Sequence, residues 1–303
     1  MARIVFMGSP DFALPTLHAL HESHELVGVV TQPDRLAGRG RVLRPPAVKE
    51  AAQQLGLPLI QPKRLSEEGA MQQLAEWAPD AIVVAAFGQI LKPAVLELPL
   101  HGCINVHASL LPSWRGAAPI HAAILHGDDE TGITIMKMDP GLDTGPILSQ
   151  RAIPIQDDDT SGTLFDKLAQ LGGDLLIETL PGYLAGRLVP VPQDESQATL
   201  APTLKKEEGE LDFSQPAEGL ARKVRAFNPW PGAYTFLDGQ PFKVHLAHAV
   251  KGGGQPGQRS VHEELPAIAT SDGLLVLDTV QPAGKQAMGG ADFLRGARDW
   301  TTT

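Results

Sequence analysis

Two patterns of apolar residues alternate along the first half of the chain. Short continuous apolar runs are typical of strands buried on both faces of a parallel sheet, and they cover residues 3–7, 26–31 and 81–86. Between them lie stretches with the spacing of amphipathic helices, over residues 12–20, 47–55 and 66–77. Strands that alternate with helices predict an α/β fold with a doubly wound, mostly parallel sheet.

The pattern changes near residue 205, where short β-type runs separated by glycine and proline begin. These runs cover residues 234–237, 242–249, 267–270 and 274–280, and one predicted helix covers residues 217–226. Several short strands at such a spacing predict a small C-terminal β-barrel of the OB type. Residues 188–204 have several prolines and no lasting period, which predicts a linker between an α/β domain over 1–187 and an OB-like domain over 205–303.

Three polar side chains of the α/β domain are candidates for a functional site. Alternation along the predicted strand 104–107 puts Asn105 and His107 on one face, and Pro112 ends the pairing of this segment soon afterwards. The pair therefore sits at the carboxyl end of a strand, where open α/β sheets bind their ligands. Asp143 follows the next apolar strand in a glycine-flanked loop, which suits a side chain that must be aimed rather than packed.

An amide, an imidazole and a carboxylate can together support acyl transfer. The amide NH₂ and an imidazolium N–H can form an oxyanion hole, while the carboxylate keeps the imidazole charged or accepts a proton. No serine, cysteine or threonine nucleophile is needed, so the group favours direct transfer of an acyl group to an amine. Nearby Arg115 could meet a carboxylate or a phosphate. The spacing alone also allows a purely structural role for Asn105 and His107, and that alternative stays open.

Basic residues gather in two places. Four arginines fall within ten residues of the glycine- and proline-rich loop 32–46, where they cannot form a core. We expect either a solvated loop or a flexible arm for a phosphate backbone or a nucleic-acid end. The predicted helix 217–226 brings three more cations together, although ordinary solvated side chains would give the same pattern. In chain order these residues are Arg35, Arg39, Arg41, Arg44, Arg222, Lys223 and Arg225.

Composition narrows the class of protein. The 303-residue chain is 43% hydrophobic, which is typical of a soluble globular protein long enough for two domains. Its formal charge of -10 counts mildly against a nucleic-acid partner. The charge is, however, unevenly distributed. Residues 1–204 contain 14 Lys and Arg and 23 Asp and Glu, whereas residues 205–303 contain 11 and 12, so the C-terminal part is nearly neutral. The single cysteine excludes an internal disulfide, and we see neither a cleavable leader nor an apolar run near about 18 residues. We therefore expect a cytoplasmic protein that does not enter a membrane.

Two classes of cofactor are not favoured. The first predicted turn contains Gly8 alone rather than the G-x-G-x-x-G of dinucleotide-binding folds, which counts against NAD. The histidines and the cysteine between residues 101 and 126 match no zinc-binding spacing. We expect no metal site.

Three motifs carry a resemblance to a known family. Asn105-x-His107, the run from Ser109 to Ile120 and the motif Gly141-Leu142-Asp143-Thr144-Gly145 resemble the folate-dependent formyltransferases. Further blocks at residues 6–12, 31–40, 225–231 and 281–288 are similar to the branch of that family that acts on initiator tRNA. The resemblance therefore covers the chain nearly from end to end.

The resemblance implies a reaction and its substrates. A formyl group would move from 10-formyltetrahydrofolate, released as tetrahydrofolate, to the α-amine of methionine on initiator methionyl-tRNA. Asn105 and charged His107 would stabilise the oxyanion, and Asp143 would keep His107 charged and assist proton removal. The arginine loop would insert at the acceptor end of the tRNA, with Arg39 matching the key arginine of the family. We expect a monomer. The folate-binding residues implied by the resemblance are Ser109, Leu110, Leu111, Pro112, Phe87, Gly88, Ile90 and Asp139.

Two other functions stay open. A related folate enzyme that acts on a sugar nucleotide or on glycinamide ribonucleotide would keep Asn105, His107 and Asp143 but would need neither the arginine loop nor an RNA-binding barrel. A non-catalytic RNA-binding protein would have no reason to place such a polar triad at a sheet crevice. A formyl-transfer assay with these substrates separates the three functions.

Overall fold

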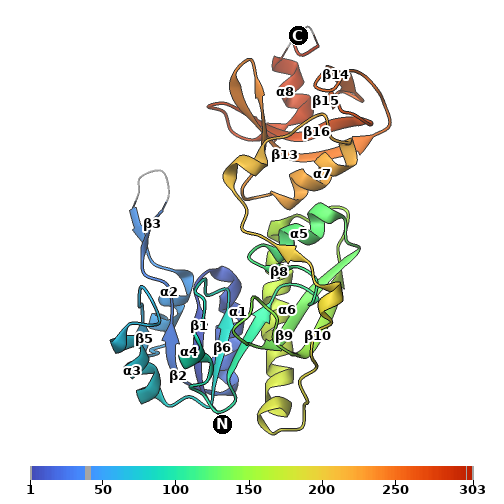
Figure 1. Ribbon diagram of the computed structural model, residues 1–303. Coiled ribbons are helices and arrows are strands. Elements are labelled where there is room, and N and C mark those ends of the chain that lie inside the picture. The colour runs from blue at the N-terminus through green and yellow to red at the C-terminus, as the bar shows by residue number, and fades with distance from the viewer. Residues whose placement is uncertain (1, 38–41, 298, 302–303) are drawn as a thin grey trace. The chain divides into compact units, whose positions relative to one another are not determined.

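The computed structural model describes residues 2–37, 42–297 and 299–301 (Figure 1). Its chain divides into two compact units. The first unit contains residues 1–116, 130–153 and 165–200, and the second contains residues 117–129, 154–164 and 201–303. The division at 187 and 205 follows from the sequence alone and stays a prediction. In the structure two segments from within residues 1–187 group with the C-terminal strands.

A seven-stranded sheet forms the centre of the first unit. Its strand order is β10-β9-β7-β6-β1-β2-β5. The neighbours from β7 to β5 pair in parallel, and β9 pairs antiparallel with β7. The strands are β1 (Arg3–Gly8), β2 (Glu25–Val30), β5 (Leu59–Ile60), β6 (Ala81–Ala85), β7 (Cys103–His107), β9 (Glu130–Lys137) and β10 (Ile147–Pro154). The helices connected to this sheet are α1 (Leu14–Ser23), α2 (Ala47–Gln54), α3 (Glu68–Trp77), α4 (Pro93–Leu96) and α6 (Ser161–Leu184). The predicted α/β class is confirmed.

Alternation along β7 decides which way its side chains face. Cys103 belongs to a core cluster that also contains residues of α3 and α4. On the opposite face, Val106 lies against α6, where a Cβ added to Gly172 would come 2.7 Å from Val106 Cγ1. Because side chains two residues apart share a face, Asn105 and His107 project to the side of Cys103 and away from α6.

The second unit is built on an antiparallel sheet. Its strand order is β12-β13-β16-β15-β14, and β17 pairs with the other part of β16. The strands are β12 (Ala233–Leu237), β13 (Gln240–Val250), β14 (Arg259–His262), β15 (Leu265–Ala269), β16 (Leu274–Pro282) and β17 (Met288–Gly289). Leu220 and Val224 of α7 (Ala217–Ala226) join a core with Phe242 and Leu275, and α8 (Gly290–Gly296) covers part of it. The helix α5 (Pro119–His126) also belongs to this unit. The predicted C-terminal β domain of the OB-like class is confirmed.

The predicted arginine loop contains regular structure. β3 (Arg35–Ala37) and β4 (Val42–Arg44) form an antiparallel hairpin in which Arg35 is opposite Arg44. The exposed fractions of Leu36, Val42 and Leu43 are 62%, 62% and 59%. The backbone pairing of a few residues close in sequence is enough to order these strands, although their side chains stay exposed. Apolar periodicity does not detect strands of this kind.

The predicted linker is bonded to the first unit as far as residue 200. Val191 and Ile147 exchange two backbone hydrogen bonds of 2.8 Å, and a short 3₁₀ turn, Glu195–Gln197, follows. The sequence analysis also missed β8 (Arg115–Gly116) and β11 (Leu200–Ala201), because two-residue strands have no measurable period. Within the described residues, no helix has both the length and the apolar character to cross a bilayer.

Candidate active site

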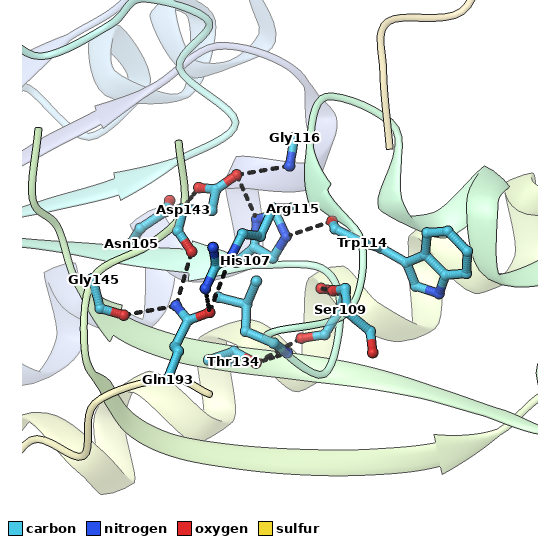
Figure 2. Close-up of polar contacts among 12 residues, drawn as sticks. Asn105, His107, Ser109, Trp114, Arg115, Gly116, Thr134, Asp143, Gly145 and Gln193 are labelled. Atoms are coloured by element: carbon cyan, nitrogen blue, oxygen red, sulfur yellow. Dashed lines mark hydrogen bonds and ion pairs between the residues drawn. The ribbon is translucent and has the colours of Figure 1, made fainter. Parts of the chain in front are cut away.

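β7 and the loop after β9 bring together the three side chains that the sequence predicts as catalytic (Figure 2). Asn105 Nδ2 donates a long hydrogen bond of 3.4 Å to Asp143 Oδ1, and His107 Nδ1 lies 3.7 Å from Asp143 Oδ2. The exposed fractions of the His107 and Asp143 side chains are only 6% and 14%. Water therefore screens the interaction of these two groups much less than it would on an open surface.

Both ring nitrogens of His107 face oxygen atoms of the protein. Nε2 lies 3.2 Å from the carbonyl oxygen of Trp114, while Nδ1 faces Asp143. A neutral imidazole has one N–H and one lone pair, so it can satisfy only one of these acceptors, whereas the doubly protonated ring donates to both. The Trp114 carbonyl oxygen and the Asp143 carboxylate therefore lie beside different nitrogens of the ring.

Glycine residues permit the backbone path of the loop that contains Asp143. Asp143 has a φ of +52°, in the left-handed region, and its Oδ2 accepts a 2.9 Å hydrogen bond from the Gly116 N–H. Gly116 has a φ of +121°, which a residue with a side chain rarely adopts. At Gly145 an added Cβ would collide with the carbonyl oxygen of Lys137. Gly116 and Gly145 therefore permit the backbone geometry that aims the Asp143 carboxylate.

Arg115 meets a carboxylate, one of the two partners that the sequence suggests. Its Nη1 and Nη2 each donate to a carboxylate oxygen of Glu195 at 2.8 Å, and its Nε and Nη2 donate to Gln193 Oε1 at 3.0 and 2.8 Å. The guanidinium is nearly buried, with 5% of the side chain exposed. The hydrogen-bonded Glu195 carboxylate is the main cause that raises the pKa of Arg115, and burial opposes it.

Gln193 connects this arginine to the Asp143 loop. Its Nε2 donates to the carbonyl oxygens of Asp143 at 2.8 Å and Gly145 at 2.7 Å. The sequence analysis missed Gln193 and Glu195, since they lie in the segment predicted as a linker and 50 to 80 residues from their partners. A contact between residues so far apart cannot be predicted from the pattern of neighbouring residues. The segment's lack of hydrophobic periodicity predicted a linker, and it does not indicate which side chains the segment contacts.

The predicted folate residues of the segment after β7 differ in exposure. Ser109 is fully buried, with its Oγ donating to the carbonyl oxygen of Ser113 at 2.6 Å, and Leu111 is 3% exposed. The Leu111 backbone is also bonded, because its N–H donates to Thr134 Oγ1 at 3.0 Å. Leu110 and Pro112 are partly exposed. This segment can therefore offer an apolar ledge at two of its four predicted positions.

The predicted folate residues after β6 also differ in their exposure to solvent. Phe87 is 2% exposed in the core, and its carbonyl oxygen accepts hydrogen bonds from Gln32 Nε2 and Ser9 Oγ. Gly88 is exposed, and Ile90 is 87% exposed. Leu142, next to Asp143, is 59% exposed. Single apolar side chains are often exposed on protein surfaces, so this exposure permits contact with a ligand but does not by itself identify one.

Asp139, the last of the predicted folate residues, holds its own loop. Its Oδ1 accepts hydrogen bonds from the Gly141 N–H at 3.0 Å and from Thr144 Oγ1 at 2.7 Å. One of these bonds comes before Asp143 in the sequence and the other comes directly after it. Asp143 thus lies between two points at which the loop is fixed.

The predicted tRNA-binding arginines of the hairpin are only partly described. Arg35 and Arg44 are exposed and face each other across the strand pair. Arg35 Nη2 donates to Gln32 Oε1 at 3.0 Å. Arg39 and Arg41 lie outside the described residues.

The three predicted cations of α7 are half-buried rather than fully exposed. Lys223 Nζ donates to the carbonyl oxygen of Glu210 at 2.7 Å, and Arg225 Nη1 donates to that of Asp159 at 3.0 Å. Burial lowers the pKa of both Lys223 and Arg225. The side chain of Arg222 lies beside Gly127, where an added Cβ would come 3.3 Å from the arginine. Much of the hydrogen-bonding capacity of this helix is directed to the protein itself.

Among the described residues, no cluster of three or more His, Cys, Asp or Glu side chains could hold a metal ion. The absence of a metal from the function stays a prediction.

The chain matches the formyl transferase family over residues 2–180 and the C-terminal domain of formyl transferases over residues 203–298. It therefore belongs to the formyl transferase family, and the resemblance drawn from the motifs is confirmed. The methionyl-tRNA formyltransferase of Myxococcus xanthus (strain DK1622) is 51% identical over 297 residues, which are 97% of this chain and 95% of that protein. The methionyl-tRNA formyltransferase of Geobacillus thermodenitrificans (strain NG80-2) is 48% identical over 302 residues, 98% and 95% of the two chains.

Solved structures share the fold at much lower sequence identity. WlaRD, a sugar 3N-formyl transferase in the presence of dTDP and 5-N-formyl-THF, has a TM-score of 0.69 and 17% identity, covering 94% of this chain and 99% of its own.

Proposed function

We propose that this protein transfers a formyl group from 10-formyltetrahydrofolate to the α-amine of methionine on initiator methionyl-tRNA. The product, N-formylmethionyl-tRNA, serves translation initiation. One observation carries the proposal: the Asn105 amide, the His107 imidazole and the Asp143 carboxylate meet at the carboxyl end of β7. The relatives named methionyl-tRNA formyltransferase, at 51% and 48% identity over nearly the whole chain, support the choice of substrate.

Each of the three side chains has a part in the chemistry. The Asn105 amide has two N–H groups, and one of them is directed to Asp143, so the other can donate to the formyl oxygen as it becomes negative. Charged His107 stabilises the same oxygen mainly through its positive charge, because its ring nitrogens face Trp114 and Asp143. Asp143 keeps His107 charged and, through water, accepts the proton that the attacking amine loses. The new N–C bond forms first and gives the tetrahedral oxyanion. When this intermediate collapses, the bond from the formyl carbon to the folate nitrogen breaks, and the proton taken from the amine passes through water to that nitrogen, which leaves as tetrahydrofolate.

We propose that the folate donor lies against the ends of β6 and β7. Gly88 and Ile90 are exposed there, and Leu110 and Pro112 are partly exposed, so these four offer direct contacts to a flat ring system. Buried Phe87, Ser109 and Leu111 shape the wall from behind. Asp139 acts by holding the Asp143 loop. No metal takes part in this scheme.

The hairpin and the second unit are proposed to bind the tRNA. We propose that exposed Arg35 and Arg44 contact phosphates of the acceptor end. The sequence resemblance implies the same role for Arg39 and Arg41. The domain over 205–303, joined by 188–204 to the catalytic domain over 1–187, contributes positive potential from half-buried cations of α7 at residues 222, 223 and 225. We propose that the enzyme acts as a monomer in the cytoplasm, where charged tRNA is used.

A substrate comparison tests this function. The full chain is incubated with 10-formyltetrahydrofolate labelled in the formyl carbon and with initiator methionyl-tRNA, and formylmethionine is measured after deacylation together with released tetrahydrofolate. Parallel reactions contain elongator methionyl-tRNA, glycinamide ribonucleotide or an amino-sugar nucleotide. We expect label on the initiator tRNA and equimolar release of tetrahydrofolate. Label only on a small amine would point to a related folate enzyme, and no release with any acceptor would point to a non-catalytic RNA-binding protein.

A further inference from the structure

The side chain of Gln193 uses all of its hydrogen-bonding capacity around the Asp143 loop (Figure 2). Its amide group donates to the carbonyl oxygens of Asp143 and Gly145, at 2.8 and 2.7 Å. Its carbonyl oxygen accepts from Arg115 Nε and Nη2, at 3.0 and 2.8 Å. A glutamine side chain has two N–H donors and two acceptor lone pairs, so every one of them has a partner here.

Arg115 makes this arrangement rigid. Its guanidinium is nearly buried and is held on its outer side by the Glu195 carboxylate through two hydrogen bonds of 2.8 Å. A planar guanidinium paired with a carboxylate through two bonds has a fixed orientation. Gln193 is therefore placed between a fixed cation and the backbone of the catalytic loop.

The loop needs such support at Asp143. The residue adopts a left-handed backbone conformation that residues with side chains rarely take. Gln193 fixes the carbonyl oxygens of Asp143 and Gly145, while Asp139 bonds to Gly141 before Asp143 and to Thr144 after it. Without Gln193, the later half of this loop would have to find other donors for two carbonyl oxygens.

We propose that Gln193 is a positioning residue for formyl transfer, held by Arg115 and Glu195, which sets the place of the Asp143 carboxylate opposite His107 and Asn105. The segment that supplies it has no part in the proposed chemistry and was predicted from sequence to be only a linker. This inference rests on the proposed function, because it assigns Gln193 a role in that reaction. It differs from the proposed function in having a test that does not depend on activity.

Two substitutions at residue 193 separate its two bonding roles. Gln193→Leu removes the donors and the acceptor with little change in volume. Gln193→Glu keeps the acceptor for Arg115, and adds charge complementarity, but loses both donors to the loop. Because Gln193→Glu still gives the buried Nε of Arg115 an acceptor, it should fold even if Gln193→Leu does not. Gln197→Leu is the matched control, since the exposed Gln197 amide on the same segment bonds to exposed Asp194 instead of to the Asp143 loop.

Steady-state kinetics give the first readout. We expect both substitutions at Gln193 to lower kcat by up to about 100-fold, as expected when a reacting group is misplaced by about 1 Å. The KM values for the folate donor and for methionyl-tRNA should change little, because the loop positions Asp143 for chemistry rather than for binding. Gln197→Leu should behave as the wild type. Wild-type kcat in Gln193→Glu would overturn the inference, and so would a loss expressed only in KM.

The backbone amide of Gly116 gives the second readout. Its N–H donates to Asp143 Oδ2 at 2.9 Å, so its hydrogen exchange reports whether the carboxylate is in place. We expect exchange at Gly116 to become faster in Gln193→Glu than in the wild type or Gln197→Leu. Unchanged exchange would overturn the inference even if the wild type had no activity with methionyl-tRNA. An inactive wild type with faster exchange in Gln193→Glu would instead reject the proposed function alone.

Discussion

Asp143→Asn tests how much the carboxylate contributes to catalysis. The substitution keeps the shape of the side chain, removes its charge and replaces one acceptor oxygen by an NH₂ group. Gly116 N–H and Asn105 NH₂ both donate to the wild-type carboxylate, and the third neighbour is His107. If the introduced amide keeps its oxygen toward Gly116, its NH₂ group faces that of Asn105. Asn105 must then turn its own oxygen inward, and its donor to the formyl oxygen is lost.

The size of the effect follows from the separation and burial of the charges. His107 Nδ1 and Asp143 Oδ2 are 3.7 Å apart, and both side chains are mostly buried. At an effective dielectric constant of about 20, two unit charges at this separation attract each other by about 4 kcal/mol, whereas in water the value would be about 1 kcal/mol. The amide dipole and rearranged water recover part of this attraction. We therefore expect kcat to fall by about 100- to 1000-fold.

The assay is single-turnover formylation of initiator methionyl-tRNA at saturating folate donor, with donor affinity measured separately by fluorescence or calorimetry. Asp174→Asn is the control, because Asp174 is an exposed carboxylate that accepts a hydrogen bond from Gln170 on α6, far in sequence from the predicted catalytic residues. Donor affinity should stay close to that of the wild type in both variants. A rate for Asp143→Asn within about threefold of the wild-type rate means that the activation barrier rises by less than about 1 kcal/mol. That result would refute the assignment of Asp143 as the partner of His107.

Three further outcomes are expected. Asn105→Ala and His107→Ala should each raise the barrier by about 2.7–4 kcal/mol, seen as a steep loss of kcat with nearly intact folate affinity, and normal turnover would remove the substituted residue from the mechanism. Burial raises the pKa of the Cys103 thiol to about 12, so iodoacetamide at about pH 8 should label the thiol only after denaturation, and rapid labelling of the folded protein would contradict its burial. Burial also lowers the pKa of His121, despite an opposing backbone hydrogen bond to Trp230. The unfolded state therefore takes up a proton below about pH 6.5 that the folded state resists, and the free energy of unfolding should decrease as the pH falls through that range. His121→Gln should make this decrease shallower than the exposed control His18→Gln does, and equal pH profiles of thermal unfolding would exclude the effect.

The sequence reached the site through strand alternation. The period of two along β7 requires Asn105 and His107 to share a face, whatever packs around the strand. The glycines around Asp143 likewise marked a loop with unusual backbone angles. Strand alternation and the positions of glycines depend on a few neighbouring residues, so the sequence is enough to recognise them.

The hairpin shows where local reading is incomplete. Arg35 to Arg44 was predicted as an irregular loop because glycines and arginines dominate it. In the structure the residues on either side of the undescribed part pair as β3 and β4, opposite each other in register. Strand pairing of three residues leaves no periodic signal, since the side chains involved remain exposed.

The chain itself determined the strand and helix order, the facing of Asn105 and His107, and the family resemblance, because periodicity, glycine and proline act over a few residues. Only the tertiary structure decided what surrounds them: that the Trp114 carbonyl and Asp143 lie on two sides of His107, and that Gln193, 50 residues further along, holds the loop. Such contacts depend on the folded path of the whole unit. Hydrogen bonds between distant segments form wherever that path brings a donor within about 3 Å of an acceptor, and nothing in the neighbouring sequence encodes the distance.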